Sequence, residues 1–293
     1  MTRPQNAIFI EGSQFYLALE YCCTASPQLK AALQTARDLA AAAADAHVVF
    51  ALGSTLLGAL SGGQLKDFSA ITGLGGLTAP ATQRDLLIWI HGPGADANFD
   101  LGRAIHNVLK PHGELMLEAP GFTYRENRDM TGFIDGTANP KDAEALEAAL
   151  IPEGRENAGG AYVISMQYVH DLDAFHKMPV REQENVIGRA KPDSTEMESA
   201  VKPKDAHIAR AEVTEDGVEQ KIYRRSFPYG GVQLHGLYFL AFACEQHRFE
   251  AILNSMYGLT GDGLHDRLLD YTRAVTGSYW FAPSREALDT MLR

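Results

Sequence analysis

The chain has 293 residues, enough for one large domain or two modest ones with a sizeable buried core. Its formal net charge of -11 and the absence of a Lys and Arg cluster argue against nucleic acid as a partner, since a phosphate-binding surface concentrates basic residues. No uninterrupted apolar run reaches the roughly 18 residues of a membrane span, so no contact with membrane is expected.

Hydrophobic periodicity in the first half predicts strands and helices in a definite order. The expected elements are strand 15–21, helix 28–46, strand 47–52, a glycine-rich segment 58–76, strand 85–91, helix 96–110 and strand 114–122. The second half partly repeats this order. It is expected to contain helix 142–150, strand 161–168, helical segments within 171–188, a hairpin turn at 214–217, strand 233–243, helix 246–257 and strand 278–281.

This order favours an α+β fold in two halves over a parallel doubly wound sheet, in which strands and helices would alternate strictly. We expect an N-terminal half at 1–130 and a C-terminal half at 131–293, each an antiparallel sheet with helices packed on it. No glycine-rich phosphate loop opens a predicted helix, which disfavours nucleotide chemistry. Cys22, Cys23 and Cys244 form neither a disulfide framework nor a zinc pattern, and they suit a reducing cytosol.

One loop holds a single carboxylate between two glycines. It reads Gly132-Phe133-Ile134-Asp135-Gly136-Thr137-Ala138-Asn139-Pro140. Glycine adopts backbone angles closed to other residues and lets a flat ligand approach the main chain, while Pro140 prevents a strand from continuing. The sequence therefore predicts that Asp135 faces a cavity. The alternative is a solvated Asp-Gly turn.

Two further segments offer candidate side chains. His207 lies where a polar loop is expected to lead into a strand, and a single imidazole can ligate haem iron; the alternative is a surface or hydrogen-bonded loop histidine. Arg224 and Arg225 lie in a predicted strand, so their side chains should point to opposite faces, one inward and one into solvent. An inward guanidinium stabilises anionic oxygen, whereas the alternative is two strand cations bound to carboxylates.

Four segments together resemble the dye-decolorizing peroxidases in their residues, order and spacing. They are Gly-Phe-Ile-Asp-Gly-Thr at 132–137, Ile187-Gly188-Arg189 with Asp193-Ser194, the histidine at 207, and Arg-Arg-Ser-Phe-Pro-Tyr-Gly at 224–230. The resemblance runs through most of the chain, although these motifs all fall in the second half. It implies a tandem ferredoxin-like α+β fold that binds one haem b in the C-terminal half.

The resemblance also implies roles for individual residues. His207 is the proximal iron ligand, and Asp135 and Arg224 stand on the distal face of the haem. Arg189 pairs with a haem propionate, because a planar cation suits a carboxylate. The remaining expected contacts with the cofactor or its distal water are made by Gly136, Thr137 and Ser226.

The acid expected to accept a hydrogen bond from the proximal histidine lies in Gly261-Asp262-Gly263-Leu264-His265-Asp266. Asp266 is preferred for its distance from His207 in related sequences, and Asp262 is the alternative. Such a carboxylate makes the imidazole more anionic and favours higher iron oxidation states.

The function that the resemblance implies is a haem b peroxidase, which reduces hydrogen peroxide through a ferryl intermediate and oxidises dyes, phenolics or porphyrinogens. Asp135 moves a proton between the two peroxide oxygens, and Arg224 stabilises the charge that develops as the O–O bond breaks. A carboxylate base predicts an acidic pH optimum. The alternatives are a haem- or porphyrin-binding protein for haem transfer or iron release, and another haem reaction such as chlorite decomposition.

The expected partners are hydrogen peroxide and a small aromatic or porphyrin reductant. Electrons enter either at the haem edge or through oxidisable side chains such as Trp89, Trp280 and the tyrosines. No export signal is visible near the amino terminus, and we expect a cytoplasmic protein similar to the porphyrinogen peroxidase subgroup. Self-association into a dimer or larger homo-oligomer is expected, whereas packaging in an encapsulin shell is not.

Overall fold

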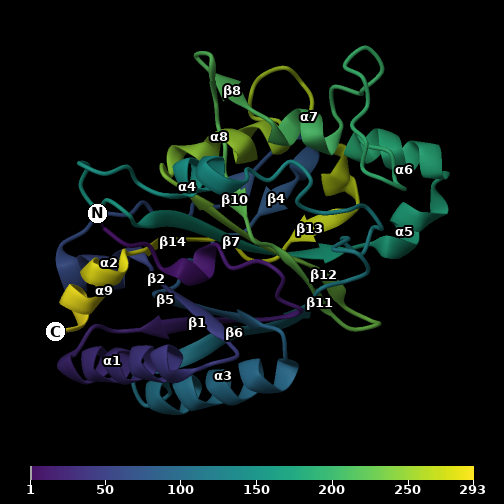
Figure 1. Cartoon of the computed structure of the whole chain (residues 1–293). Helices are drawn as coiled ribbons and strands as arrows, with labels where there is room; N and C mark the ends of the chain where they lie inside the picture. The colour runs from purple at the N-terminus through teal and green to yellow at the C-terminus, as the bar shows by residue number, and fades with distance from the viewer. Residues whose placement is uncertain (1) are drawn as a thin grey trace.

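The structure is a computed structural model that describes residues 2–293. The first half forms a four-stranded antiparallel sheet in the order β6-β1-β5-β2. Two long helices, α1 and α3, lie along one face of this sheet (Figure 1). The main elements of this half are β1 (Phe15–Cys23), α1 (Pro27–Ala42), β2 (His47–Leu52), α2 (Ser54–Ser61), β5 (Leu86–Gly92), α3 (Ala95–Leu109) and β6 (Gly113–Phe122).

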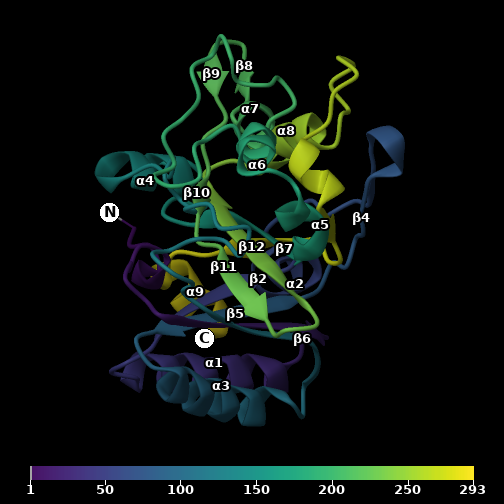
Figure 2. The same ribbon diagram turned by 90° about the vertical axis from the view of Figure 1, so that its right-hand side faces the viewer.

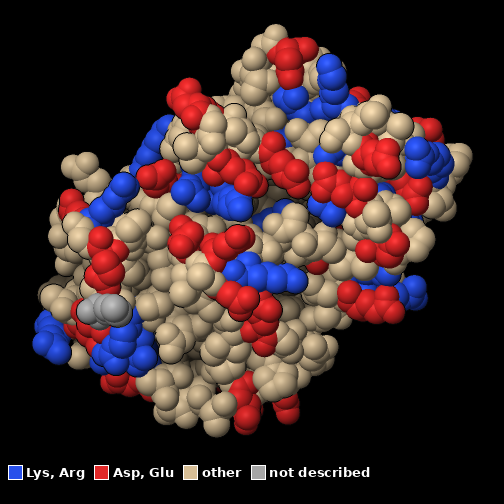
Figure 3. Space-filling model, turned by 45° about the horizontal axis from the view of Figure 1, so that its top comes forward, with Lys and Arg blue, Asp and Glu red and all other residues tan. Residues whose placement is uncertain are grey.

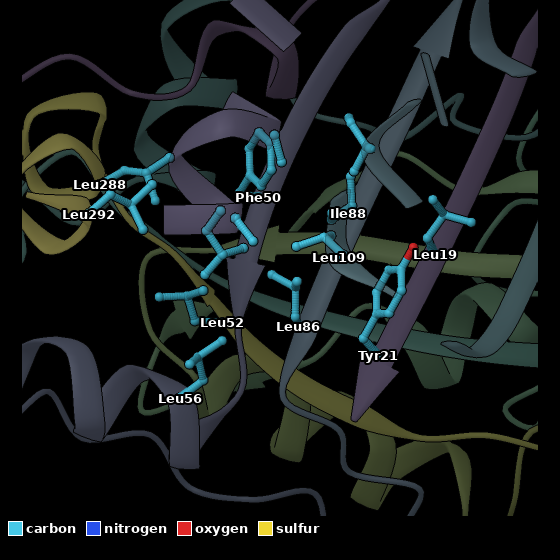
Figure 4. Packing of buried hydrophobic residues seen from close by; sticks show 14 of the residues in the cluster. Leu19, Tyr21, Phe50, Leu52, Leu56, Leu86, Ile88, Leu109, Leu288 and Leu292 are labelled. Carbon is cyan, nitrogen blue, oxygen red and sulfur yellow. The ribbon is translucent and has the colours of Figure 1, made fainter. Parts of the chain in front are cut away.

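The apolar faces of the first sheet and its helices form one core. Leu19 and Ile88 of the sheet and Leu109 of α3 are almost completely buried in it (Figure 4). Helix α1 begins with Pro27, and the Ser26 hydroxyl accepts a hydrogen bond from the Leu29 backbone N–H at 3.0 Å. Proline in the first turn and a serine cap both favour a helix start, which explains why α1 begins at Pro27.

The second half forms the sheet β14-β7-β12-β11, also antiparallel. The short strand β10 pairs with β12 beyond the end of β11, and β13 pairs with β7 beyond the end of β14. The elements of this half are α4 (Asp142–Ala149), β7 (Ala161–His170), α5 (Leu172–Lys177), α6 (Val180–Ile187), α7 (His207–Ala211), β8 (Thr214–Glu215), β9 (Val218–Glu219), β10 (Tyr223–Arg224), β11 (Phe227–Gly230), β12 (His235–Ala243), α8 (His247–Met256), β13 (Thr272–Ala274), β14 (Ser278–Ala282) and α9 (Arg285–Leu292). Short elements complete the chain: 3-10 turns at Asn6–Ile8, Leu74–Gly76 and Arg267–Asp270, and the β3 (Ile71–Thr72) and β4 (Thr78–Ala79) pair.

The two sheets lie face to face and join at both edges. β6 meets β11 at Gly121 and Tyr229, and β2 meets β14 at Leu52 and Phe281, so the strands close into a barrel. A Cβ atom at Gly121 would clash with the Phe227 ring and lie 2.7 Å from the Pro228 carbonyl oxygen, so glycine is required where β6 pairs with β11. Aromatic and aliphatic side chains fill the interior, among them Trp89, Trp280, Tyr238 and Phe242.

Most of the predicted elements are present, with differences at particular places. The segment that starts at His207 was expected to be a strand and is instead the short helix α7, because its alanines and arginine favour a helix. The segment 58–76 was expected to be glycine-rich without a helix, but its first residues, 58–61, belong to helix α2. Helix α9 was not predicted, and it packs its apolar side against α1 and α2 of the first half. No helix within residues 2–293 combines the length and apolar content that a membrane span requires.

Candidate functional site

A cavity of about 760 Å³ lies on the outer side of the second sheet. It is bordered by β10 of that sheet and by α6, α7 and α8, which lie above the sheets in Figure 2. Much of its wall is apolar and comes from Ile164, Ile187, Leu237, Phe239, Ile252 and Met256. The predicted site residues that also line it are Asp135, Gly136, Thr137, Arg189, His207, Arg224 and Ser226.

His207 is held by the carboxylate behind it. Its Nδ1 lies 2.7 Å from Oδ2 of Asp266, which is fully buried, while Oδ1 of Asp266 accepts a hydrogen bond from the Leu268 N–H at 2.9 Å. A carboxylate only accepts, so Nδ1 carries the hydrogen and Nε2 keeps its lone pair in the neutral ring. No hydrogen bond to Nε2 is found within residues 2–293.

The charge of Asp266 also affects the protonation of His207. Burial disfavours the imidazolium, but the nearby carboxylate outweighs it, and the pKa of His207 is raised above its usual value. The alternative acid, Asp262, does not reach His207. It is bound by the Arg210 guanidinium at 2.6 Å instead.

The loop that carries Asp135 uses both glycines in the left-handed region. Gly132 has φ +93° and Gly136 has φ +78°, values that side chains with a Cβ rarely adopt. Oδ1 of Asp135 accepts a hydrogen bond from the Gly136 N–H at 2.7 Å, and Oδ2 has no hydrogen-bond partner within residues 2–293. One carboxylate oxygen is therefore fixed by the loop, and the other is available to a ligand.

Arg224 and Arg225 point to opposite sides of the second sheet. The Arg224 side chain lines the cavity, and its buried Nε has no hydrogen-bond partner in the part of the chain that is described. Arg225 was expected to stay in solvent if its neighbour faced inward. It is buried instead, donating to the carbonyls of Ile8 and Ile10 and lying 5.0 Å from the Trp89 ring centre inside the barrel.

Arg189 lines the cavity and is held by its own loop. Its guanidinium donates to the Ser194 carbonyl at 3.1 Å and to the Glu196 carboxylate at 3.0 Å. Its Nη2 also lies 3.7 Å from the Glu212 carboxylate, an ion pair rather than a hydrogen bond. Two of its five N–H donors make hydrogen bonds in this way, which leaves donors that a ligand could bind. Ser226 Oγ accepts a hydrogen bond from the Leu240 N–H at 3.3 Å, while Thr137 is exposed at the edge of the cavity.

Asn139 is a functional candidate that the sequence reasoning did not single out. Its side-chain oxygen accepts from the Arg224 N–H at 2.8 Å, and its amide donates to the Arg224 carbonyl at 2.9 Å. This pair of hydrogen bonds ties the Asp135 loop to β10. Asn139 was visible as part of the loop motif, but its partner lies 85 residues away in the sequence.

The cavity entrance carries charges of both signs. Lys141, Glu144, Glu212 and Lys221 line its outer part. Acidic and basic side chains are interspersed over the face of the molecule shown in Figure 3, and no continuous basic patch covers it.

Comparison with known proteins assigns the chain to a family. The family model described as "Dyp-type peroxidase, C-terminal" matches residues 126–287, which include every residue placed around the cavity above. The chain belongs to the Dyp-type peroxidase family. A dye-decolorizing peroxidase of Mycolicibacterium paratuberculosis is 41% identical over 216 residues, which cover 72% of this chain and 61% of the relative.

Solved structures of the family match nearly the whole chain. A dye-decolorizing protein from V. cholerae has 38% identity and a TM-score of 0.90, with 97% of this chain and 98% of that chain covered. A DypB variant from Rhodococcus jostii in complex with haem has 30% identity and a TM-score of 0.91, and 98% of each chain is covered. The fold is therefore that of the Dyp-type peroxidases, and haem is the cofactor found in family structures. The chain spans about three fifths of the length of the curated relatives it matches.

Proposed function

We propose that this protein is a haem b peroxidase that reduces hydrogen peroxide and oxidises dyes, phenolics or porphyrinogens. The observation that carries the proposal is the meeting of three groups at one cavity: His207 with its buried acid, a carboxylate with a free oxygen, and an arginine with an unpartnered buried nitrogen. A haem carrier would need the histidine but neither of the other two groups. Asp135 and Arg224 therefore favour turnover over haem transfer or iron release.

The residues present fit a haem. The cavity volume suits a ligand of that size, and the apolar wall suits a porphyrin ring. The free Nε2 of His207 would ligate the iron, with Asp266 fixing the ring through Nδ1. Arg189 would pair with a propionate through its remaining donors, and Gly136, Thr137 and Ser226 would line the distal side.

The bound haem would supply the electrons that reduce peroxide and recover them from the reductant. The free Oδ2 of Asp135 takes the proton from one peroxide oxygen and returns it to the other, which leaves as water. Arg224 remains protonated, and its guanidinium stabilises the negative charge on the departing oxygen. The apolar wall keeps bulk water out and thereby strengthens both interactions.

Finer features of the protein are part of this proposal. The main elements of the first half follow the order strand, helix, two strands, helix, strand (β1, α1, β2, β5, α3, β6). The second half contains the same order among additional short elements (β7, α5 to α7, β11, β12, α8, β14), which supports a tandem ferredoxin-like description with halves at 1–130 and 131–293. Cys22, Cys23 and Cys244 are free thiols, which supports a cytoplasmic location. We also propose a homo-oligomer, because symmetric self-association is common among soluble enzymes.

The test is a set of variants examined by stopped-flow absorption after haem reconstitution. Asp135→Asn and Arg224→Leu should bind haem as the wild type does and react with peroxide at least about a hundredfold more slowly, the usual scale for loss of one proton-transfer or charge-stabilising group. Asp262→Asn serves as the control, since its carboxylate binds Arg210 away from His207. Peroxide kinetics unchanged in both distal variants would exclude the assigned mechanism.

A further inference from the structure

A buried histidine–carboxylate pair on the cavity wall has no part in the chemistry proposed above. His170 at the end of β7 and Asp129 in the turn before the Asp135 loop lie 3.0 Å apart, between Nε2 and Oδ2. The His170 side chain is only 5% exposed and that of Asp129 only 16%. Both residues line the cavity. Polar groups at this depth are costly unless all of their hydrogen bonds are made.

The pair is fully hydrogen-bonded. Nδ1 of His170 lies 2.7 Å from the hydroxyl of Thr272, the first residue of β13. The other oxygen of Asp129 accepts from the backbone N–H of Thr131 at 2.8 Å and from its hydroxyl at 2.6 Å. Burial would raise the pKa of Asp129, but His170 and Thr131 outweigh it and lower that pKa to about 2. These partners therefore favour the ionised form of the Asp129 carboxylate.

Asp129 belongs to the same hairpin as Asp135. Its N–H donates to the Phe133 carbonyl at 2.9 Å, and its carbonyl accepts from the Gly132 N–H at 2.8 Å. One step further along, the Asp135 N–H donates to the Asn127 carbonyl at 2.9 Å. Two consecutive steps of backbone hydrogen bonds thus connect the Asp129 turn to the backbone of Asp135.

We propose that His170 and Asp129 are positioning residues for Asp135, joining the hairpin that carries it to the ends of β7 and β13. Because the carboxylate only accepts, Nε2 of His170 must carry a hydrogen. In the neutral ring, Nδ1 accepts a hydrogen bond from the Thr272 hydroxyl. In the protonated ring, Nδ1 donates to that hydroxyl, which then donates its own hydrogen to the Val169 carbonyl at 3.4 Å. The connection therefore holds in either protonation state of the ring. The inference rests on the proposed role of Asp135.

The experiment compares His170→Phe, which keeps a ring and removes both hydrogen bonds, with His170→Gln, which keeps one N–H donor for Asp129. His247→Phe is the matched control, because His247 also pairs with a carboxylate, that of Glu215 at 2.6 Å, but on the exposed surface. Two quantities are measured on haem-reconstituted protein: amide hydrogen exchange within 131–137, and the rate constant of the peroxide reaction. The haem dissociation constant is measured alongside.

His170→Phe should raise amide exchange within 131–137 and lower the peroxide rate constant, each about tenfold, the scale for loss of one buried charged hydrogen bond. The haem dissociation constant of His170→Phe should stay at its wild-type value. The amide exchange and the peroxide rate constant of His170→Gln should lie between those of His170→Phe and the wild type, and His247→Phe should match the wild type in all three measurements. If His170→Phe does not fold, His170→Gln alone must show both changes. Unchanged exchange within 131–137, or a loss of haem affinity with the peroxide rate constant retained, would overturn the inference. A wild-type protein that binds haem without reacting with peroxide would contradict the proposed function, while the exchange result would still test the connection.

Discussion

Replacement of Asp266 by asparagine tests the histidine–acid pair beneath the proposed haem. The structure places Oδ2 of Asp266 2.7 Å from Nδ1 of His207, with the carboxylate fully buried. Asparagine keeps an acceptor oxygen and removes the charge. The hydrogen bond to His207 then becomes weaker by about 1–1.5 kcal/mol, the difference in net free energy between a charged and a neutral hydrogen bond.

This difference converts to a reduction potential. The carboxylate stabilises the more positively charged ferric iron through the imidazole, so its removal should raise the ferric/ferrous potential. For a one-electron couple, 1–1.5 kcal/mol corresponds to an increase of about 45–65 mV. Asp262→Asn is the control, because Asp262 binds Arg210 and should leave the potential at the wild-type value.

A redox titration followed by the absorption of the haem measures the potential in all three proteins. The reasoning is refuted if Asp266→Asn has the wild-type potential, or if Asp262→Asn shifts it by as much. The first result would mean that the carboxylate does not act on the iron. The second would mean that any change near this loop produces the effect.

Four further outcomes are expected. His207→Ala should lose haem, measured by its absorption after reconstitution and desalting. Arg225→Leu should lower the free energy of unfolding, measured in urea, by about 2–4 kcal/mol, because the carbonyls of Ile8 and Ile10 lose their donor. The peroxide rate constant of folded Arg225→Leu should stay near the wild-type value, in contrast to that of Arg224→Leu. Asn139→Ala should slow the peroxide reaction with haem affinity retained, since it frees the backbone of Arg224. Haem affinity should fall about tenfold per pH unit below the raised pKa of His207, because the proton then occupies the nitrogen that would bind iron; a pH-independent affinity would contradict this ligand.

The sequence was most informative where function depends on local conformation. The two glycines around Asp135 could be interpreted as backbone positions with positive φ, and both have it. The opposite orientation of Arg224 and Arg225 followed from the two-residue period of a strand. The sequence did not predict that the Arg225 side chain would be buried, because the N-terminal segment that covers it lies more than 200 residues earlier in the chain.

The remaining features depend on contacts between distant segments. Asp129 and His170 are 41 residues apart, and no spacing rule brings a turn residue to the end of a strand. Helix α7 was mistaken for a strand because it is only five residues long, too short to show a helical period. Helix α9 had a usable signal: Ser284 caps it, and Leu288, Met291 and Leu292 follow at helical spacing.

The absorption spectrum of the haem-reconstituted protein, recorded before and after one equivalent of hydrogen peroxide, tests the central claim most directly. We predict a haem band that changes when peroxide is added and returns when a phenolic reductant follows, with the change on peroxide addition strongly slowed in Asp135→Asn. No haem band after reconstitution, or a band that peroxide leaves unchanged, would contradict the account.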